Sequence, residues 1–136
     1  MNKKKRIITA VVAMAMFCMM SMSTLAATKV IISLPENQVW TSSAAISRSG
    51  NYSYLWAGCD TVYPLSGTDN FSRIQVRLVN ASGKLIMTKD YETLTEGETA
   101  RLLYIDDGYL ASKTVYIQFR GNTKAAAGAI VEYFSL

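Results

Sequence analysis

Two segments of the chain place aromatic and polar side chains at every second position. In an extended strand, successive side chains point to opposite faces, so every second residue shares a face. If Leu55, Ala57 and Cys59 point into a core, Tyr54 and Trp56 point outward. Exposed Trp and Tyr rings on a sheet offer flat surfaces on which sugar rings can stack or a protein partner can anchor.

The second segment, residues 113–120, follows the same rule. Its apolar set is Val115, Ile117 and Phe119, and its polar set is Tyr116, Gln118 and Arg120. We therefore expect the ligand-binding residues to be Tyr54, Trp56, Tyr116, Gln118 and Arg120. A purely structural interpretation competes with this one, because Tyr and Trp populate strands in general and a loop can cover a sheet face.

Histidine is absent from the whole chain. Its absence excludes Ser-His-Asp and Cys-His catalytic machinery and removes the most common metal ligand. Only Cys59 follows the N-terminal segment, so an ordinary zinc site is also excluded. Catalysis would have to use carboxylates, Lys or Tyr. We expect no catalytic residues, no metal site and no cofactor.

Asp106 and Asp107 form the only pair of adjacent acidic residues. A glycosidase needs two carboxylates that converge from opposite sides of a bond, about 5 to 9 Å apart. Neighbours in a turn usually point apart, and Gly108 follows this pair, so we interpret it as a solvated turn. Calcium could use this pair or Asp69 and Asn70, but neither loop has EF-hand spacing.

The N-terminus has the pattern of a secretory signal peptide. Lys3 to Arg6 are basic, an apolar run extends from Ile7 to Met20, and small residues follow up to Ala26. The apolar run is shorter than the roughly 20 residues of a membrane-spanning helix. We expect cleavage after Ala26, which leaves residues 27–136 as one secreted domain of bacterial type without a wall-sorting signal or membrane anchor.

Removal of this segment changes the charge balance. Four of the 14 basic residues lie in it, and ten basic and ten acidic residues remain. Nucleic acid and anionic membrane surfaces are bound by clustered Lys and Arg, so we expect neither as a partner. Cys59 has no intramolecular disulfide partner in the remaining chain. It is either a buried, inert side chain or the link of a disulfide-bonded dimer, and the oligomeric state is left open.

Turn-forming residues divide the chain into about eight candidate strands with no convincing helical period. They are 28–34, 38–46, 52–62, 74–79, 84–91, 99–105, 113–120 and 125–134. We expect two hairpins, one closed by the turn at 80–83 and one closed by the turn at 121–124. Short strands with polar turns and no βα alternation indicate an all-β antiparallel sandwich, of either jelly-roll or immunoglobulin-like topology.

These expectations favour a non-catalytic extracellular binding or adhesion module with a carbohydrate or protein ligand. The alternative is a secreted antagonist, similar in role to a bacteriocin or toxin, although the neutral charge lacks the cationic amphipathic feature of membrane attack. A carboxylate-based hydrolase ranks last, because no convergent acidic pair is evident.

Overall fold

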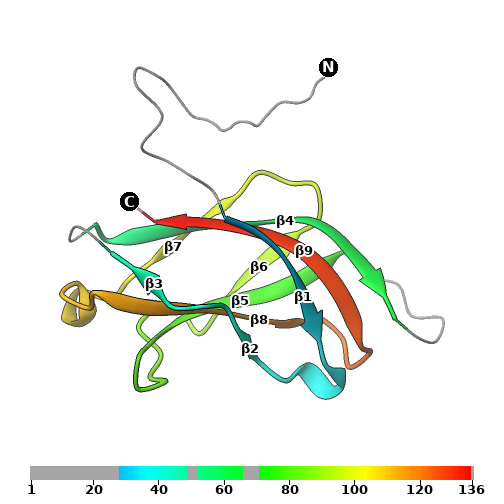
Figure 1. Cartoon of the computed structure of the whole chain (residues 1–136), viewed down its shortest axis with the longest axis horizontal. Coiled ribbons are helices and arrows are strands. Elements are labelled where there is room, and N and C mark those ends of the chain that lie inside the picture. The colour runs from blue at the N-terminus through cyan, green and yellow to red at the C-terminus, as the bar shows by residue number, and fades with distance from the viewer. Residues whose placement is uncertain (1–27, 49–51, 66–70, 136) are drawn as a thin grey trace.

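A computed structural model describes residues 28–48, 52–65 and 71–135 of the chain. Two antiparallel sheets pack face to face, which confirms the predicted all-β sandwich (Figure 1). The predicted signal peptide and the acidic loop at Asp69 and Asn70 lie outside the described residues.

Sheet A contains four strands in the order β1, β9, β4, β7. Their bounds are β1 Thr28–Leu34, β9 Ala127–Ser135, β4 Tyr54–Pro64 and β7 Arg101–Tyr104. The first and last strands are neighbours, and Thr28 pairs with Tyr133. The beginning of β1 therefore lies beside the end of β9.

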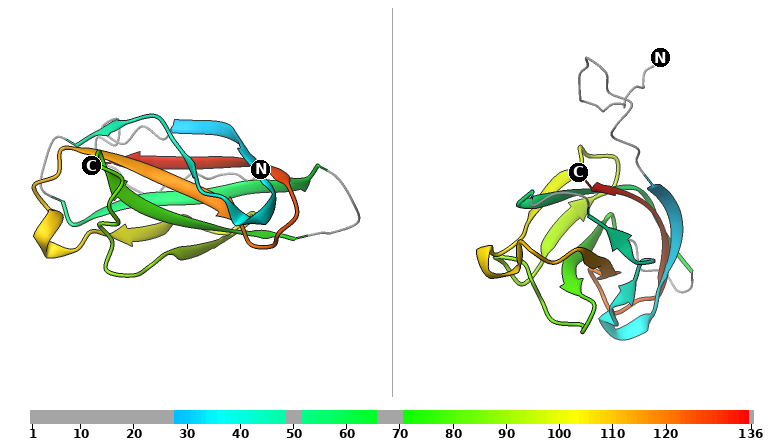
Figure 2. Two further views of the ribbon diagram at one scale, coloured as in Figure 1. Left: turned by 90° about the horizontal axis from the view of Figure 1, so that it is seen from below. Right: turned by 60° about the vertical axis from the view of Figure 1, so that its left-hand side comes forward.

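Sheet B is built around β8, Thr114–Gly121, which pairs with β5, Arg73–Asn80. The other edge of β5 carries β6, Glu92–Thr95. The other edge of β8 carries two short strands, β2 Thr41–Ser42 and β3 Ile46–Ser47. Two 3-10 turns, η2 Glu36–Gln38 and η3 Asp107–Tyr109, lie in the connections. Figure 2 shows the two layers from two further directions.

The core fills the space between the sheets with every second side chain of the long strands. In β8, Val115, Ile117 and Phe119 are fully buried, and the intervening residues lie on the outer face. Sheet A contributes the buried side chains of Leu55, Ala57, Cys59, Ala127, Ala129, Val131 and Tyr133. Burying an aliphatic or aromatic side chain of this size stabilises a fold by about 1.5 to 3 kcal/mol.

The expected closing hairpin is wrong. β8 and β9 lie in different sheets, because the segment between Gly121 and Ala127 carries the chain from sheet B to sheet A. Alternation of apolar and polar residues identifies the inward face of a strand but does not identify its partner. A short turn between two strands was therefore compatible with a crossing between layers as well as with a hairpin.

The expected hairpin of residues 74–79 with 84–91 forms only beside its turn, where Val79 and Leu85 make an antiparallel bridge. The turn forms, and the Asn80 side-chain oxygen accepts hydrogen bonds from the backbone of Ser82 and Lys84, both at 3.0 Å. Beyond the turn the returning chain makes only isolated bridges, because Ile86 and Met87 enter the core instead of extending a ladder. The ladder partners of β5 are β8 and β6, and β6 lies in a segment where no strand is expected from the sequence.

Candidate binding faces on the two sheets

The outer face of sheet A carries four neighbouring aromatic rings, Tyr54, Trp56, Tyr104 and Phe134, which we call the aromatic row. Strand register produces it, because Trp56 pairs with Phe134 and Tyr54 pairs with Tyr104. The rings of Trp56 and Phe134 stack, with centroids 5.6 Å apart and planes 17° apart. Tyr54 meets Trp56 edge to face at 6.3 Å and Tyr104 at 6.2 Å.

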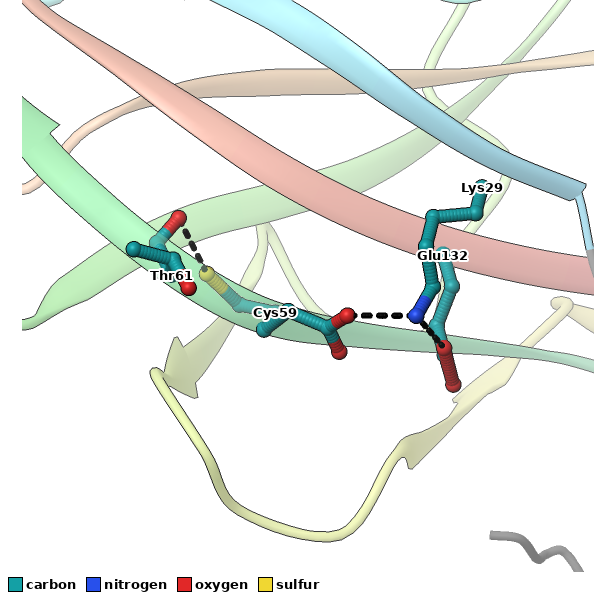
Figure 3. A network of polar contacts seen from close by, with 5 residues as sticks. Lys29, Cys59, Thr61 and Glu132 are labelled. Atoms are coloured by element: carbon teal, nitrogen blue, oxygen red, sulfur yellow. Dashed lines mark hydrogen bonds and ion pairs between the residues drawn. The ribbon is translucent and has the colours of Figure 1, made fainter. Parts of the chain in front are cut away.

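Charged side chains lie one step along the same face. Lys29 Nζ contacts Asp60 Oδ2 at 2.6 Å and Glu132 Oε1 at 3.8 Å (Figure 3). Gly58 lies opposite Glu132 in the ladder and presents no side chain there. The aromatic row is therefore bordered by two carboxylates that share one ammonium group.

The environment shifts the pKa of two of these groups. Burial raises the pKa of Glu132 above its ordinary value, and the nearby charge of Asp60 raises it further, while Lys29 partly offsets both effects. The hydrogen bond to Asp60 raises the pKa of Lys29, so this side chain stays positively charged at neutral pH. Lys29 thus supplies the charge that lets both carboxylates occupy one surface.

Cys59 lies under this face and points into the core, which favours the buried side chain of the two alternatives left open by the sequence. Its side chain is 2% exposed, and its Sγ lies 3.7 Å from the carbonyl oxygen of Thr61 (Figure 3). Burial raises the pKa of the thiol to about 12, with smaller contributions from Glu96 and Asp60. The thiol stays protonated at neutral pH, so neither a disulfide-linked dimer nor nucleophilic chemistry suits it.

The outer face of sheet B carries the other three residues expected to bind a ligand. Tyr116, Gln118 and Arg120 are all half-buried there. Because sheet B packs on the opposite side of the core from sheet A, these three lie far from Tyr54 and Trp56. The five residues therefore form two separate groups.

Arg120 belongs to a cluster that the sequence analysis did not identify. The guanidinium carbons of Arg120 and Arg77 each lie 4.3 Å from the centroid of the Trp40 ring. We call these three residues the arginine–tryptophan cluster. Arg77 lies at an outward position of β5 by simple alternation, but only the register Arg77 to Gln118 shows that it neighbours Arg120. Trp40 precedes β2 and reaches the same face.

The turn with Asp106 and Asp107 is solvated, as expected, and both residues are exposed. In the described part of the chain, no group of three or more His, Cys, Asp or Glu residues is arranged to hold a metal ion. Within the same residues, no helix has the length and apolar character needed to cross a membrane. No family model, no curated protein and no solved structure matches the chain.

Proposed function

We propose that the protein is a non-catalytic extracellular binding module that holds a glycan on the aromatic row. The observation that carries this proposal is the continuity of four rings on one outward sheet face, bordered by Lys29, Asp60 and Glu132. The extracellular location rests on the signal-peptide pattern of residues 1–26.

The chemistry of the face suits a sugar. Aromatic rings provide apolar contact area with little loss of conformational freedom on binding, and sugar rings present apolar C–H faces to them. A few polar groups beside such a surface fix the orientation of the ligand. Here the carboxylates of Asp60 and Glu132 can accept hydrogen bonds from sugar hydroxyls, while Lys29 limits their mutual repulsion.

The aromatic row favours an extended ligand, because its rings come from three neighbouring strands, β4, β7 and β9. An extended ligand such as a polysaccharide segment can gain contact area on an open face by lying across several strands.

The strand order supports a jelly-roll connectivity for this module. When β2 and β3 are counted as one interrupted strand, sheet A takes the first, eighth, third and sixth strands of the chain, in that order. Sheet B takes the second, seventh, fourth and fifth. Jelly rolls include lectin domains, but one architecture serves many functions, so the aromatic row carries the proposal.

Two carboxylates beside an aromatic surface favour a second candidate function, glycoside hydrolysis. Glycosidases use a pair of acids whose pKa values differ, and burial raises the pKa of Glu132. However, Lys29 contacts both acids and the face is open, which favours binding over cleavage.

The test is a Trp56→Ala substitution in the purified protein, assayed on a glycan array and by titration with the best ligand. We expect affinity to fall about tenfold or more, because a central aromatic contact typically contributes about 2 kcal/mol or more. Trp56→Phe should retain most of the affinity, since a ring remains in place.

Val39→Ala is the control, because it removes a side chain that is 53% exposed and lies outside the aromatic row. Thermal unfolding should establish that each variant is folded. Undiminished glycan binding by a folded Trp56→Ala variant would contradict the proposal. Release of new reducing ends from the bound glycan, abolished by Glu132→Gln, would instead favour hydrolysis.

A further inference from the structure

Two arginine side chains contact the same tryptophan ring on the outer face of sheet B. Both guanidinium carbons lie 4.3 Å from the Trp40 ring centroid, and that of Arg120 is also 5.5 Å from the Tyr91 ring centroid. Burial lowers the pKa of Arg77, and repulsion from the charge of Arg120 lowers it further. The fold therefore holds two like charges together on a partly buried surface.

The arginines are fixed in orientation by side chains of the neighbouring strand. Arg77 Nε donates to Gln118 Oε1 at 2.7 Å, and Arg120 Nε donates to Gln75 Oε1 at 2.5 Å. Each hydrogen bond runs between β5 and β8, one in each direction, so both guanidinium groups are positioned before any ligand arrives.

A second layer of hydrogen bonds holds the two glutamines. Gln118 Nε2 donates to Ser42 Oγ at 2.9 Å, and Gln75 Nε2 donates to Asn122 Oδ1 at 3.2 Å. The amide oxygens are thereby committed to the arginines, and each glutamine keeps its amide orientation. Such supported side chains lose little conformational freedom when they bind.

In the described part of the chain, the terminal nitrogens of both arginines have no hydrogen-bond or ion-pair partner. Among residues 28–48, 52–65 and 71–135, no carboxylate forms an ion pair with Arg77 or Arg120. Within the same residues, the hydrogen bonds that the two guanidinium groups donate use only Nε, which leaves the Nη1 and Nη2 groups available. An anion bound there would remove the repulsion between the two charges.

We propose that the arginine–tryptophan cluster binds the oxyanion groups, carboxylate or phosphate, of an acidic polysaccharide. Guanidinium groups pair with the two oxygens of such an anion through parallel N–H donors. This site is independent of the proposed function, because it lies on the opposite sheet from the aromatic row and uses none of its residues.

The surroundings of the cluster favour a polysaccharide as the carrier of the anion. Besides the Trp40 and Tyr91 rings, the side chains around the arginines are the amides of Gln75, Gln118 and Asn122 and the hydroxyl of Ser42, and exposed groups of this kind can hydrogen-bond to sugar hydroxyls.

The test compares binding of the purified protein to polygalacturonate, which carries carboxylates, and to phosphomannan, which carries phosphates. Dextran serves as the neutral polysaccharide and polyglutamate as the acidic peptide. We expect binding to at least one acidic polysaccharide and none to dextran. It should weaken between about 0.1 M and 1 M NaCl, as the Debye length falls from about 10 to about 3 Å.

Arg77→Gln and Arg120→Gln should each reduce this affinity about tenfold, the loss expected for one hydrogen bond to a charged group. Arg101→Gln removes the same charge from an exposed position on sheet A and should leave binding unchanged.

Trp40 provides a readout that leaves both arginines intact. The chain has two tryptophans, so Trp40 is the only one in a Trp56→Phe variant. Its fluorescence should change on saturation with the acidic polysaccharide. The proposal is overturned if neither acidic polysaccharide binds, if only polyglutamate binds, if folded arginine variants bind undiminished, or if Trp40 emission does not respond.

Discussion

Glu132 is a carboxylate whose ionisation opposes folding. Burial raises its pKa, and the charge of Asp60 adds to that effect. The folded protein therefore binds a proton at this site more tightly than the unfolded chain does. It follows that stability is higher when Glu132 is protonated and falls as pH rises from the ordinary Glu value of about 4.3 through the raised folded value.

Glu132→Gln removes this titration and is our test at the residue scale. The variant should match the wild type near pH 4 and become more stable than it near pH 7, by no more than about 1 kcal/mol for a surface ion pair. Lys29 keeps its 2.6 Å contact with Asp60 in the variant. Urea unfolding at both pH values measures the difference.

Glu98→Gln is the control, because it removes the same charge from an exposed loop residue. If Glu132→Gln instead lowers the free energy of unfolding more near pH 7 than near pH 4, the pKa of Glu132 is not raised in the folded protein.

Alternation in the sequence predicted the outward orientation of Tyr54, Trp56 and Arg120, but it did not predict their neighbours. Arg77 lies outward by the same rule, yet its proximity to Arg120 depends on the register of β5 against β8.

The buried position of Arg48 is not predicted from the sequence at all. It lies in a segment that sequence patterns assign to a turn, although its side chain is 4% exposed and donates to the carbonyl oxygens of Leu110 and Ser112. Contacts across more than 60 residues leave no local signal in a sequence.

At the scale of elements, the pairing of β4 with β9 depends on a glycine covered by an aromatic ring. Gly128 lies opposite Tyr63 in the ladder, and a Cβ atom on Gly128 would lie 2.5 Å from Tyr63 Cε2. An aromatic ring over a glycine on the facing strand shields the exposed backbone there. Tyr63 and Gly128 are therefore complementary as a pair.

Gly128→Ala should destabilise the protein by about 1 to 3 kcal/mol, because the ring has to move away from the new methyl group. In a Tyr63→Ala background the same change should cost little or be stabilising, since alanine suits a strand interior better than glycine. A double-mutant cycle measured by urea unfolding gives the coupling.

Gly58→Ala is the matched control in the partner strand, where the nearest atoms to a new Cβ, in Ala100, lie at 3.3 Å. It should cost less than Gly128→Ala. If the changes in free energy of unfolding caused by Gly128→Ala and Tyr63→Ala simply add in the double variant, the Tyr63 ring is not what excludes a side chain at residue 128.

The sequence predicts where the strands lie better than it predicts which strands pair. Seven of the eight segments expected to be strands contain a strand of the structure, and the segment 84–91 does not. The expected closing hairpin is wrong and the one at 80–83 forms only beside its turn, because a short turn does not establish that the segments on either side of it pair along their length. In this sandwich the chain passes from one sheet to the other after most strands, and turn residues do not distinguish such a crossing from a hairpin.

In the whole molecule, the sandwich places the outward residues of its two sheets on opposite faces, and the sequence alone does not show which residues share a face. Residues in β4 and β8 follow the same alternation, but their outward faces point in opposite directions because the strands belong to different sheets. The all-β class followed from strand spacing, whereas the division of the candidate residues into two sites required the sheet assignment. The aromatic row and the arginine–tryptophan cluster could therefore be occupied at the same time.

The pairing of the first strand with the last also sets how the chain folds. Because β1 pairs with β9, sheet A acquires that edge only when segments about 100 residues apart have met, and such high contact order slows folding. A circular permutant that joins residue 135 to residue 28 by a short linker, with new ends between Glu98 and Thr99, makes this pairing local. We expect it to refold several-fold faster in stopped-flow experiments while keeping the wild-type circular dichroism spectrum. An unchanged refolding rate would mean that β1 docks after the rate-limiting step.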